Sequence, residues 1–242
     1  MTPLAAVSLT LTGYPSSTTA GVANNLTVKA KDTYGNTATG YTGAKSITFA
    51  GATASPSGAL PTVANSAGTA TNFGTATALN FTSGVATPAS SKNGFTKLNK
   101  VETASITASD GTISSAAALP LTVSTGAANR LAFSGLTASA GAIGSPCFFT
   151  CAVTTLGNSG TIKAKLAVTD SVGNQISNSA RTITVTATSG STVTGSPLTT
   201  PESGPAITGT EFTYTAPATG SFNHTITAAS TGLTSATATA NK

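Results

Sequence analysis

The sequence has no tryptophan, one histidine and two cysteines among its 242 residues, and only 7% of the residues are charged. An average globular protein has about 25% charged residues. The single histidine, His224, is in phase with Phe222 and Ile226 on the apolar side of an expected strand, which predicts a packed histidine and not a general base. Neither G-x-S-x-G nor S-x-x-K occurs, and no local pair of carboxylates suggests glycoside cleavage. The sequence therefore predicts a protein that is not an enzyme and has no cofactor.

The scarcity of acidic residues also weighs against a metal site. Calcium takes six to eight oxygen ligands, several of them from carboxylates, and the whole chain contains six Asp and Glu residues. A tetrahedral zinc site needs four ligands, which two cysteines and one distant histidine do not supply. No stretch approaches 18 consecutive apolar residues. We expect neither a bound metal nor insertion into a membrane.

The net charge of +5 does not indicate a nucleic-acid partner, because the charges are spread along the chain. The densest cluster is Lys92, Lys97 and Lys100 around Phe95, in a stretch that contains Gly and Asn. A phosphate-binding surface needs several cations converging on one face, together with aromatic or helical elements that contact the bases. A solvated loop explains this cluster better.

Threonine and serine are abundant instead, at about a third of all residues, and apolar residues alternate with them in many short runs. Thr and Val suit a half-buried pleated surface, while Gly and Pro occur where turns separate the runs. This pattern predicts the short strands of a β-sandwich or barrel. The predicted inward-facing residues are Val7, Leu9, Leu11, Leu26, Val28, Ala30, Ile47, Phe49, Leu79, Phe81, Ala104, Ile106, Ala108, Leu119, Leu121, Val123, Leu131, Phe133, Leu166, Val168, Ile183, Val185, Ala187, Phe212, Tyr214, Phe222, Ile226 and Ala228.

The two halves of the chain repeat one plan. Three segments of the first half match the second half, namely 9–13 with 131–135, 28–36 with 166–174, and 105–108 with 225–228. The first two offsets are 131 − 9 = 122 and 166 − 28 = 138, so the second half carries an insertion of 138 − 122 = 16 residues. We place it near residues 144–161, where it contains both cysteines. The domains predicted from this repeat are residues 1–125 and 126–242.

The repeated segments resemble bacterial immunoglobulin-like repeats. The stretch TTAGVANNLTVKAKDTYGNTATGYTG (residues 18–43) is similar to the opening of such repeats, and so are FTSGVAT (81–87) and KVETASITASDGT (100–112). The second half, with LAVTDSVGN and residues 212–242, resembles a diverged member. The resemblance implies an all-β fold of two tandem immunoglobulin-like antiparallel β-sandwiches. Such repeats occur in bacterial surface proteins and in bacteriophage virion proteins. The tryptophan packed on an inter-sheet disulfide, typical of antibody domains, is missing.

Each half carries an Asp-x-x-Gly-Asn motif, formed by Asp32, Gly35 and Asn36 in the first half and by Asp170, Gly173 and Asn174 in the second. A calcium loop is one interpretation, but too few carboxylates surround either motif. A turn is the better interpretation, because an Asp side chain caps a turn and Gly and Asn tolerate positive φ.

The motif Cys147-Phe148-Phe149-Thr150-Cys151 is predicted to close a local disulfide. A reactive thiol would need cationic neighbours that lower its pKa, and the neighbours are Phe and Pro. A ring this small stabilises the fold by about 2 kcal/mol. The disulfide implies an oxidising setting outside the cytoplasm. Because Phe148 and Phe149 must be buried by the protein itself or by a partner, we take them as the candidate contact loop.

Two surface patterns suggest further binding functions. The alternating threonines Thr182, Thr184, Thr186 and Thr188 resemble an ice-binding array, although threonine on the wet face of a strand is ordinary. Tyr14, Tyr34 and Tyr41 are the clustered aromatic residues that a carbohydrate-binding accessory module would use.

The sequence thus predicts a structural or interaction protein. The first hypothesis is a decoration or fibre component on the surface of a bacteriophage virion, which would need neither an export signal nor an anchor if these residues are a complete gene product. The alternative is an adhesive or spacer segment of a secreted or cell-surface bacterial protein. The expected partner is a multimeric protein scaffold, such as a capsid lattice or a surface appendage, with weak multivalent contact to cell-surface glycans as a further possibility.

Overall fold

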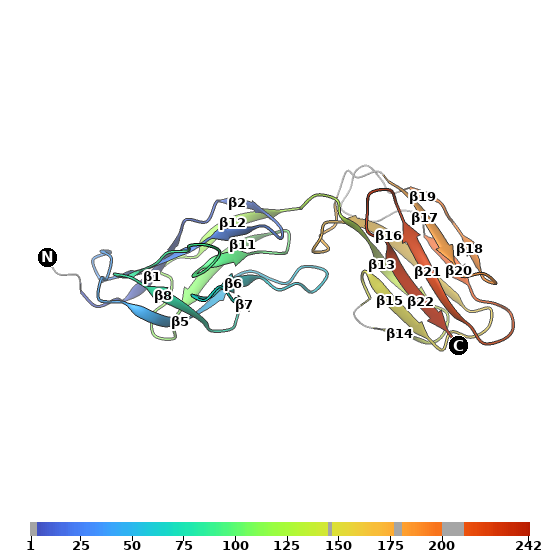
Figure 1. The fold of residues 1–242 in the computed structure, drawn as a ribbon, viewed down its shortest axis with the longest axis horizontal. Coiled ribbons are helices and arrows are strands. Elements are labelled where there is room, and N and C mark those ends of the chain that lie inside the picture. Colours follow the sequence, from blue (N-terminus) through green and yellow to red (C-terminus); the bar gives the residue numbers. More distant parts are fainter. Residues whose placement is uncertain (1–3, 145–146, 177–180, 200–210) are drawn as a thin grey trace. The chain divides into compact units, whose positions relative to one another are not determined.

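The computed structural model of the protein describes residues 4–144, 147–176, 181–199 and 211–242, and these residues form strands, turns and bends but no helix. Accordingly, no helix capable of crossing a membrane is found among them. The chain divides into two compact units, Met1–Thr125 and Gly126–Lys242, which we call unit 1 and unit 2 (Figure 1). The predicted all-β, tandem-sandwich fold is confirmed.

Unit 1 contains short strands that form three sheets. They are β1 (Ser8–Thr12), β2 (Ser17–Thr19), β3 (Ala23–Asn25), β4 (Thr27–Lys31), β5 (Gly43–Ala50), β6 (Thr62–Ala64), β7 (Ala70–Asn72), β8 (Thr77–Phe81), β9 (Val85–Ala86), β10 (Phe95–Lys97), β11 (Glu102–Ser109) and β12 (Leu119–Ser124). Their orders within the sheets are β1-β4-β9, β3-β10-β6-β7 and β2-β12-β11-β5-β8.

Unit 2 forms two sheets, and its longest strands have nine residues against eight in unit 1. The strands are β13 (Arg130–Ala138), β14 (Ala142–Ile143), β15 (Thr150–Thr154), β16 (Thr161–Thr169), β17 (Thr182–Ala187), β18 (Thr192–Thr194), β19 (Leu198–Thr199), β20 (Phe212–Thr215), β21 (Asn223–Ala229) and β22 (Ala236–Asn241). The two sheets have the orders β13-β16-β20-β18 and β14-β15-β22-β21-β17-β19.

One parallel pairing is common to both units. In unit 1 the early strand β2 pairs parallel with the last strand β12, and in unit 2 β15 pairs parallel with the last strand β22. All other pairings between strands in the described residues are antiparallel. Strand β15 therefore occupies in unit 2 the position that β2 has in unit 1.

This equivalence locates the additional residues of unit 2. They lie before β15, in the longer β13 (nine residues against five in β1), in β14 and in the segment that follows it. The predicted insertion at 144–161 therefore overlaps a strand, since Thr150–Thr154 is β15 and has its counterpart in unit 1. Residues 145–146 of that range lie outside the described residues.

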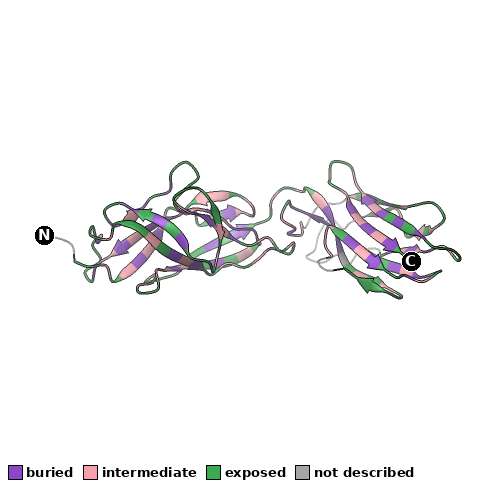
Figure 2. Cartoon of the chain, turned by 60° about the horizontal axis from the view of Figure 1, so that its bottom comes forward, coloured by how far each residue is buried: buried purple, intermediate pink, exposed green. Residues whose placement is uncertain are grey.

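The core of each sandwich is formed by the alternating residues, and Figure 2 shows the alternation of buried and exposed positions along the strands. In unit 1, Leu9, Ile47 and Phe49 are fully buried, and in unit 2 Leu131 and Phe212 are. Burying a side chain of this size contributes about 1.5–3 kcal/mol. Among the predicted inward residues, Val7 is an exception with 54% exposure. Its N–H bonds the Lys31 carbonyl, so it extends the β1–β4 pair past the end of the core.

The outward face of the larger sheet of unit 2 is a threonine-rich surface. The register aligns Thr150, Thr237, Thr227 and Thr186 in one row across β15, β22, β21 and β17. None of these four strands contains Lys, Arg, Asp or Glu. The predicted array on β17 is thus one edge of a wet, uncharged face. Adjacent strands of a sheet rotate by about 20–25° relative to one another, so this face is twisted. It therefore does not match the flat surface of an ice crystal.

Candidate functional site

The Asp-x-x-Gly-Asn motif of unit 1 is a capped turn. Asp32 Oδ1 accepts hydrogen bonds from the N–H groups of Tyr34 (3.0 Å) and Asn36 (2.8 Å), and Gly35 has a φ of 79°. Asn36 does not share this positive φ, in contrast to the sequence prediction. It contributes instead through its side chain, whose Nδ2 donates to Asp32 Oδ2 at 3.3 Å. Burial raises the pKa of Asp32, but these donors outweigh it and the net pKa lies below its ordinary value.

The motif of unit 2 has the same geometry, and its Asp170, Gly173 and Asn174 are buried. Asp170, 1% exposed, accepts from the N–H groups of Val172 (3.0 Å) and Asn174 (2.9 Å), and Asn174 Nδ2 donates to Oδ2 at 2.9 Å. Gly173 has a φ of 89°. These contacts are those of a turn.

Each Asp also fixes the segment that leads into its unit. Asp32 Oδ2 accepts the N–H of Leu4 (3.3 Å), and Asp170 Oδ2 accepts the N–H of Gly126 (3.1 Å). The two donors are separated by 126 − 4 = 122 residues, the same offset that relates the first strands of the halves. The turn thus anchors the leading segment as well as connecting two strands.

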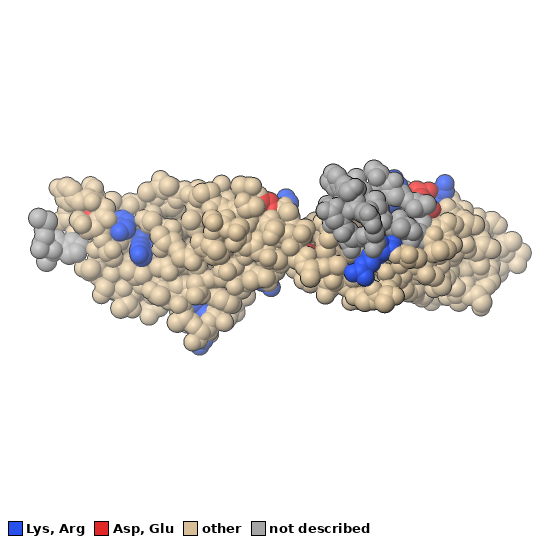
Figure 3. All heavy atoms as spheres, turned by 90° about the horizontal axis from the view of Figure 1, so that it is seen from above, with Lys and Arg blue, Asp and Glu red and all other residues tan. Residues whose placement is uncertain are grey.

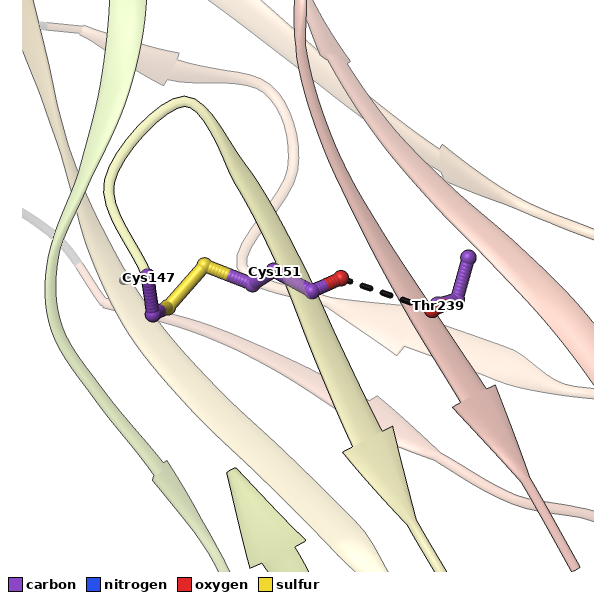
Figure 4. Close-up of a disulfide and its surroundings, with 3 residues drawn as sticks. All are labelled: Cys147, Cys151 and Thr239. Carbon is purple, nitrogen blue, oxygen red and sulfur yellow. Dashed lines mark hydrogen bonds between the residues drawn. A yellow bond between two sulfur atoms is a disulfide. The ribbon is translucent and has the colours of Figure 1, made fainter. Parts of the chain in front are cut away.

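The two cysteines form a disulfide, Cys147–Cys151, with Cα atoms 4.6 Å apart (Figure 4). Cys151 is 2% exposed and belongs to the core of unit 2, and its carbonyl accepts a bond from the Thr239 hydroxyl at 3.4 Å. Cys147 packs against the same core. The disulfide therefore joins the segment before β15 to a core strand.

The two phenylalanines of the candidate contact loop lie against unit 2 itself. The Arg130 guanidinium lies 3.5 Å from the centroid of the Phe149 ring, and Phe148 contacts Phe149 edge to face at 4.7 Å. The Phe148 carbonyl accepts the N–H of Phe133, and the Phe149 carbonyl accepts the N–H of Thr237. Both rings retain intermediate exposure. Sequence reasoning missed Arg130, because a cation so far along the chain gives no local signal.

Reduction of the disulfide is expected to destabilise unit 2 by about 2 kcal/mol and to leave unit 1 unchanged. The ring is small, so the gain in chain entropy on opening it is small, and the two units have separate cores. Thermal unfolding of the chain with and without a reductant, followed by hydrogen exchange in each unit, measures this. A matched shift in both units, or none in unit 2, would contradict it.

At the end of unit 1 where Tyr41 lies, the chain forms a hollow that the sequence analysis did not predict. Tyr41 Oη donates a 2.5 Å hydrogen bond to Asp110 Oδ2, and Lys45 Nζ lies 4.7 Å from the centroid of the Tyr41 ring. Of the two other clustered tyrosines, Tyr14 is buried and Tyr34 is 78% exposed. Asp110 is 69 residues from Tyr41, so only the fold brings them together. Lys45 could have been identified from the sequence as a candidate residue, because it is in phase with the buried Ile47 and Phe49 on the same strand.

The sequence matches no protein-family model and no curated protein. Among solved structures, it is similar to a β-glycosidase from Bacteroides vulgatus (10% identity, TM-score 0.33, covering 99% of this chain and 25% of that one). It is also similar to the D0-D1 domain of intimin (15%, 0.30, 98% and 97%) and to domains 5-6 of the S-layer protein SbsC (17%, 0.28, 99% and 97%). The chain thus spans about a quarter of the length of the glycosidase. At these identities and TM-scores, function has to be argued from the residues of this chain.

The remaining sequence candidates lie apart from one another. His224 is buried in β21, with Nδ1 2.9 Å from the Tyr214 hydroxyl. Lys97 lies in the strand β10 and not in a loop, and Lys100 pairs with Glu102 at 3.8 Å. Figure 3 shows few charged side chains on the face that it draws. In the described ranges, no three His, Cys, Asp or Glu side chains are grouped closely enough to hold a metal ion.

Proposed function

We propose that the chain is a non-catalytic spacer segment of a bacterial surface protein, and that it bears tension between its two ends. The parallel pairs β2–β12 and β15–β22 carry this proposal. In a parallel pair, the start of one strand and the end of the other lie at opposite ends of the pair. A force that separates the chain ends therefore slides the two strands past each other. It loads their hydrogen bonds together, and not one after another.

A second set of bonds has the same effect in each unit. Leu9 in β1 donates its N–H to Ser114 and accepts from Ala116 through its carbonyl. In unit 2, Thr234 accepts the N–H of Leu131 and donates to the Asn129 carbonyl. The beginning of each unit is thus held to the segment just before its last strand, which supports resistance to a pull on the ends.

One feature favours the exterior of a cell over a virion assembled in the cytoplasm. It is the Cys147–Cys151 disulfide, because disulfides form in oxidising compartments and are rare in the cytosol. The weakly charged, hydroxyl-rich surface stays hydrated but offers few anchors for a tight interface. Affinity for any scaffold is then weak per copy and becomes useful through display of many copies.

The location is tested with an antibody against this chain on intact cells that produce it. We expect labelling at the cell surface and loss of the label after treatment of intact cells with protease. Recovery of the chain only in purified phage particles would reject the cell-surface proposal and support the hypothesis of a virion component.

The mechanical role is tested by pulling single molecules of the full chain. Pulled from its two ends, the chain is expected to show two unfolding events at high force. The control uses the same chain attached through two sites at one end of a unit, so that the parallel pair is not loaded, and should unfold at several-fold lower force. Equal forces in the two geometries would reject the tension-bearing role.

A further inference from the structure

The hollow at the end of unit 1 has the dimensions of a small-ligand site. Its volume is about 460 Å³, it is open to solvent, and its walls are Leu4, Ala5, Ala6, Gly40, Tyr41 and Lys45. Small-molecule sites are typically about 300–1,000 Å³, mostly apolar, with a few placed polar groups. This hollow combines aliphatic walls, one aromatic ring, a glycine without a side chain and one cation.

The polar groups of the hollow are held in place. The Tyr41 ring contacts Phe81 edge to face at 4.9 Å, and its hydroxyl is bound to Asp110. Burial, with the Asp110 carboxylate beside it, raises the pKa of Tyr41, so the phenol stays protonated at neutral pH. Burial raises the pKa of Asp110 as well. Its net pKa is nevertheless lowered, by hydrogen bonds from the Ile113 N–H, the Tyr41 hydroxyl and the Thr112 N–H and by the charge of Lys45. The ring therefore has a fixed position.

Lys45 is the one cation that lines the hollow; among the described residues its ammonium has no ion pair within 4.0 Å, and its charge acts on Asp110 from farther away. In the described part of the chain, the ion pairs within 4.0 Å are Lys100–Glu102 and Lys163–Glu211. The Lys45 ammonium lies over the Tyr41 ring, which attracts it weakly. An ammonium in this position has donors left for an anionic group of a ligand.

Exposed apolar side chains gather at the same end of unit 1. Leu4 is 52% exposed, Val7 54% and Tyr34 78%. Asp32 connects two of them, because one carboxylate oxygen accepts the N–H of Leu4 and the other that of Tyr34. Val7 is bound to Lys31, next to Asp32. In a chain with four tyrosines and no tryptophan, this is an unusual concentration of apolar contact surface.

We propose that this hollow binds a carboxylate-bearing sugar residue of a surface glycan. The Lys45 ammonium would bind the carboxylate, and the flat carbon face of the pyranose would lie on the shallow apolar wall around Tyr41 and Leu4. A peptide carboxylate fits less well, because the walls formed by Ala5, Ala6 and Gly40 provide no deep apolar pocket for a side chain. A single ammonium on a half-buried lysine that is open to solvent gives weak binding per site, which display of many copies would strengthen.

The test is an NMR titration of the intact chain. The probes are a galacturonic acid tetramer, sialyllactose and the neutral maltotetraose, which separate uronic from sialic acids and acidic from neutral sugars. We expect saturable shifts of the amides of residues 4–6 and 40–45 with an acidic probe, and at least about tenfold weaker binding of maltotetraose. Lys45→Gln should weaken acidic-probe binding about fivefold or more. Lys97→Gln, on β10 of the same unit, should not.

Lys45→Arg is a second variant that retains the charge and should retain binding even if Lys45→Gln disturbs the fold. No saturable shift up to about 20 mM, or equal binding of acidic and neutral probes, would overturn the proposal. Tighter binding of a tetrapeptide carboxylate than of either acidic sugar would replace the glycan by a peptide. The hollow takes no part in the pulling experiment, so the spacer role and the glycan site fail separately.

Discussion

Replacing Gly51 by alanine is expected to lower the free energy of unfolding of unit 1 by more than about 3 kcal/mol. Gly51 directly follows β5 and has a φ of 94°, where a residue with a side chain costs about 1–2 kcal/mol. In addition, a Cβ at this position would overlap the carbonyl oxygen of Ser105 in β11. The Gly51 carbonyl also accepts the Ser105 N–H, so relieving the overlap breaks a bond between the two strands.

Gly35→Ala is the matched control for this prediction. Gly35 also has a positive φ of 79°, but a Cβ there meets no atom within 4 Å, so only the cost of about 1–2 kcal/mol for the backbone remains. Urea unfolding of the full chain, with hydrogen exchange to assign each transition, measures both variants. Equal losses for the two, or a loss in unit 2, would show that the close approach of Gly51 to β11 is not what stabilises unit 1.

Asp170→Ala is expected to cost unit 2 about 3 kcal/mol or more. The buried carboxylate accepts from the N–H groups of Gly126, Val172 and Asn174 and from Asn174 Nδ2. Removing it leaves these donors without their acceptor, and an unsatisfied buried donor costs about 1–3 kcal/mol. The leading segment at Gly126 loses its anchor in the same variant, so exchange of the Gly126 amide should become faster.

Glu211→Ala removes a solvent-exposed carboxylate, in contrast to the buried Asp170, and serves as the control. Glu211 is 41% exposed at its side chain, and it pairs with Lys163 at 3.7 Å. A surface pair of this sort is worth about 0–1 kcal/mol. Denaturant unfolding compares the two variants in unit 2. A loss for Asp170→Ala no larger than that for Glu211→Ala would mean that the turn does not depend on its carboxylate.

Local patterns explain what the sequence could predict. Alternation depends on neighbouring residues, so it identified strands and core residues such as Phe49 and Phe212. The turn at Asp32 was predictable because the contacts that close it, with Tyr34 and Asn36, lie within four residues. The bond from the distant Leu4 N–H was not predictable. The role of Asn36 was less predictable, because the same residue type serves a turn through either its backbone or its side chain.

Contacts between distant segments explain what the sequence could not predict. The Tyr41–Asp110 bond spans 69 residues, and the Arg130–Phe149 stack joins β13 to the segment just before β15. The place of the additional residues in unit 2 was visible only from the pairing of β15 with β22, because the alignment offset fixes their number and not their position. The hollow at the end of unit 1 could therefore be identified only once the fold was known.

The threonine-rich face of unit 2 is insensitive to the pH and the salt concentration of the medium around it. The hydroxyl groups on β15, β22, β21 and β17 have no charge to lose or gain between acidic and alkaline conditions, and these strands contain no charged residue. Dissolved salt at 0.1 M largely screens charges that are more than about 10 Å apart, but it has no such effect on neutral hydroxyls. The hydration of this face therefore stays nearly constant between low and high salt concentration. The same holds for its lack of electrostatic repulsion from a neighbouring molecule. For the surface segment proposed above, the hydration of this face would therefore not depend on the pH or the salt concentration of the surrounding medium.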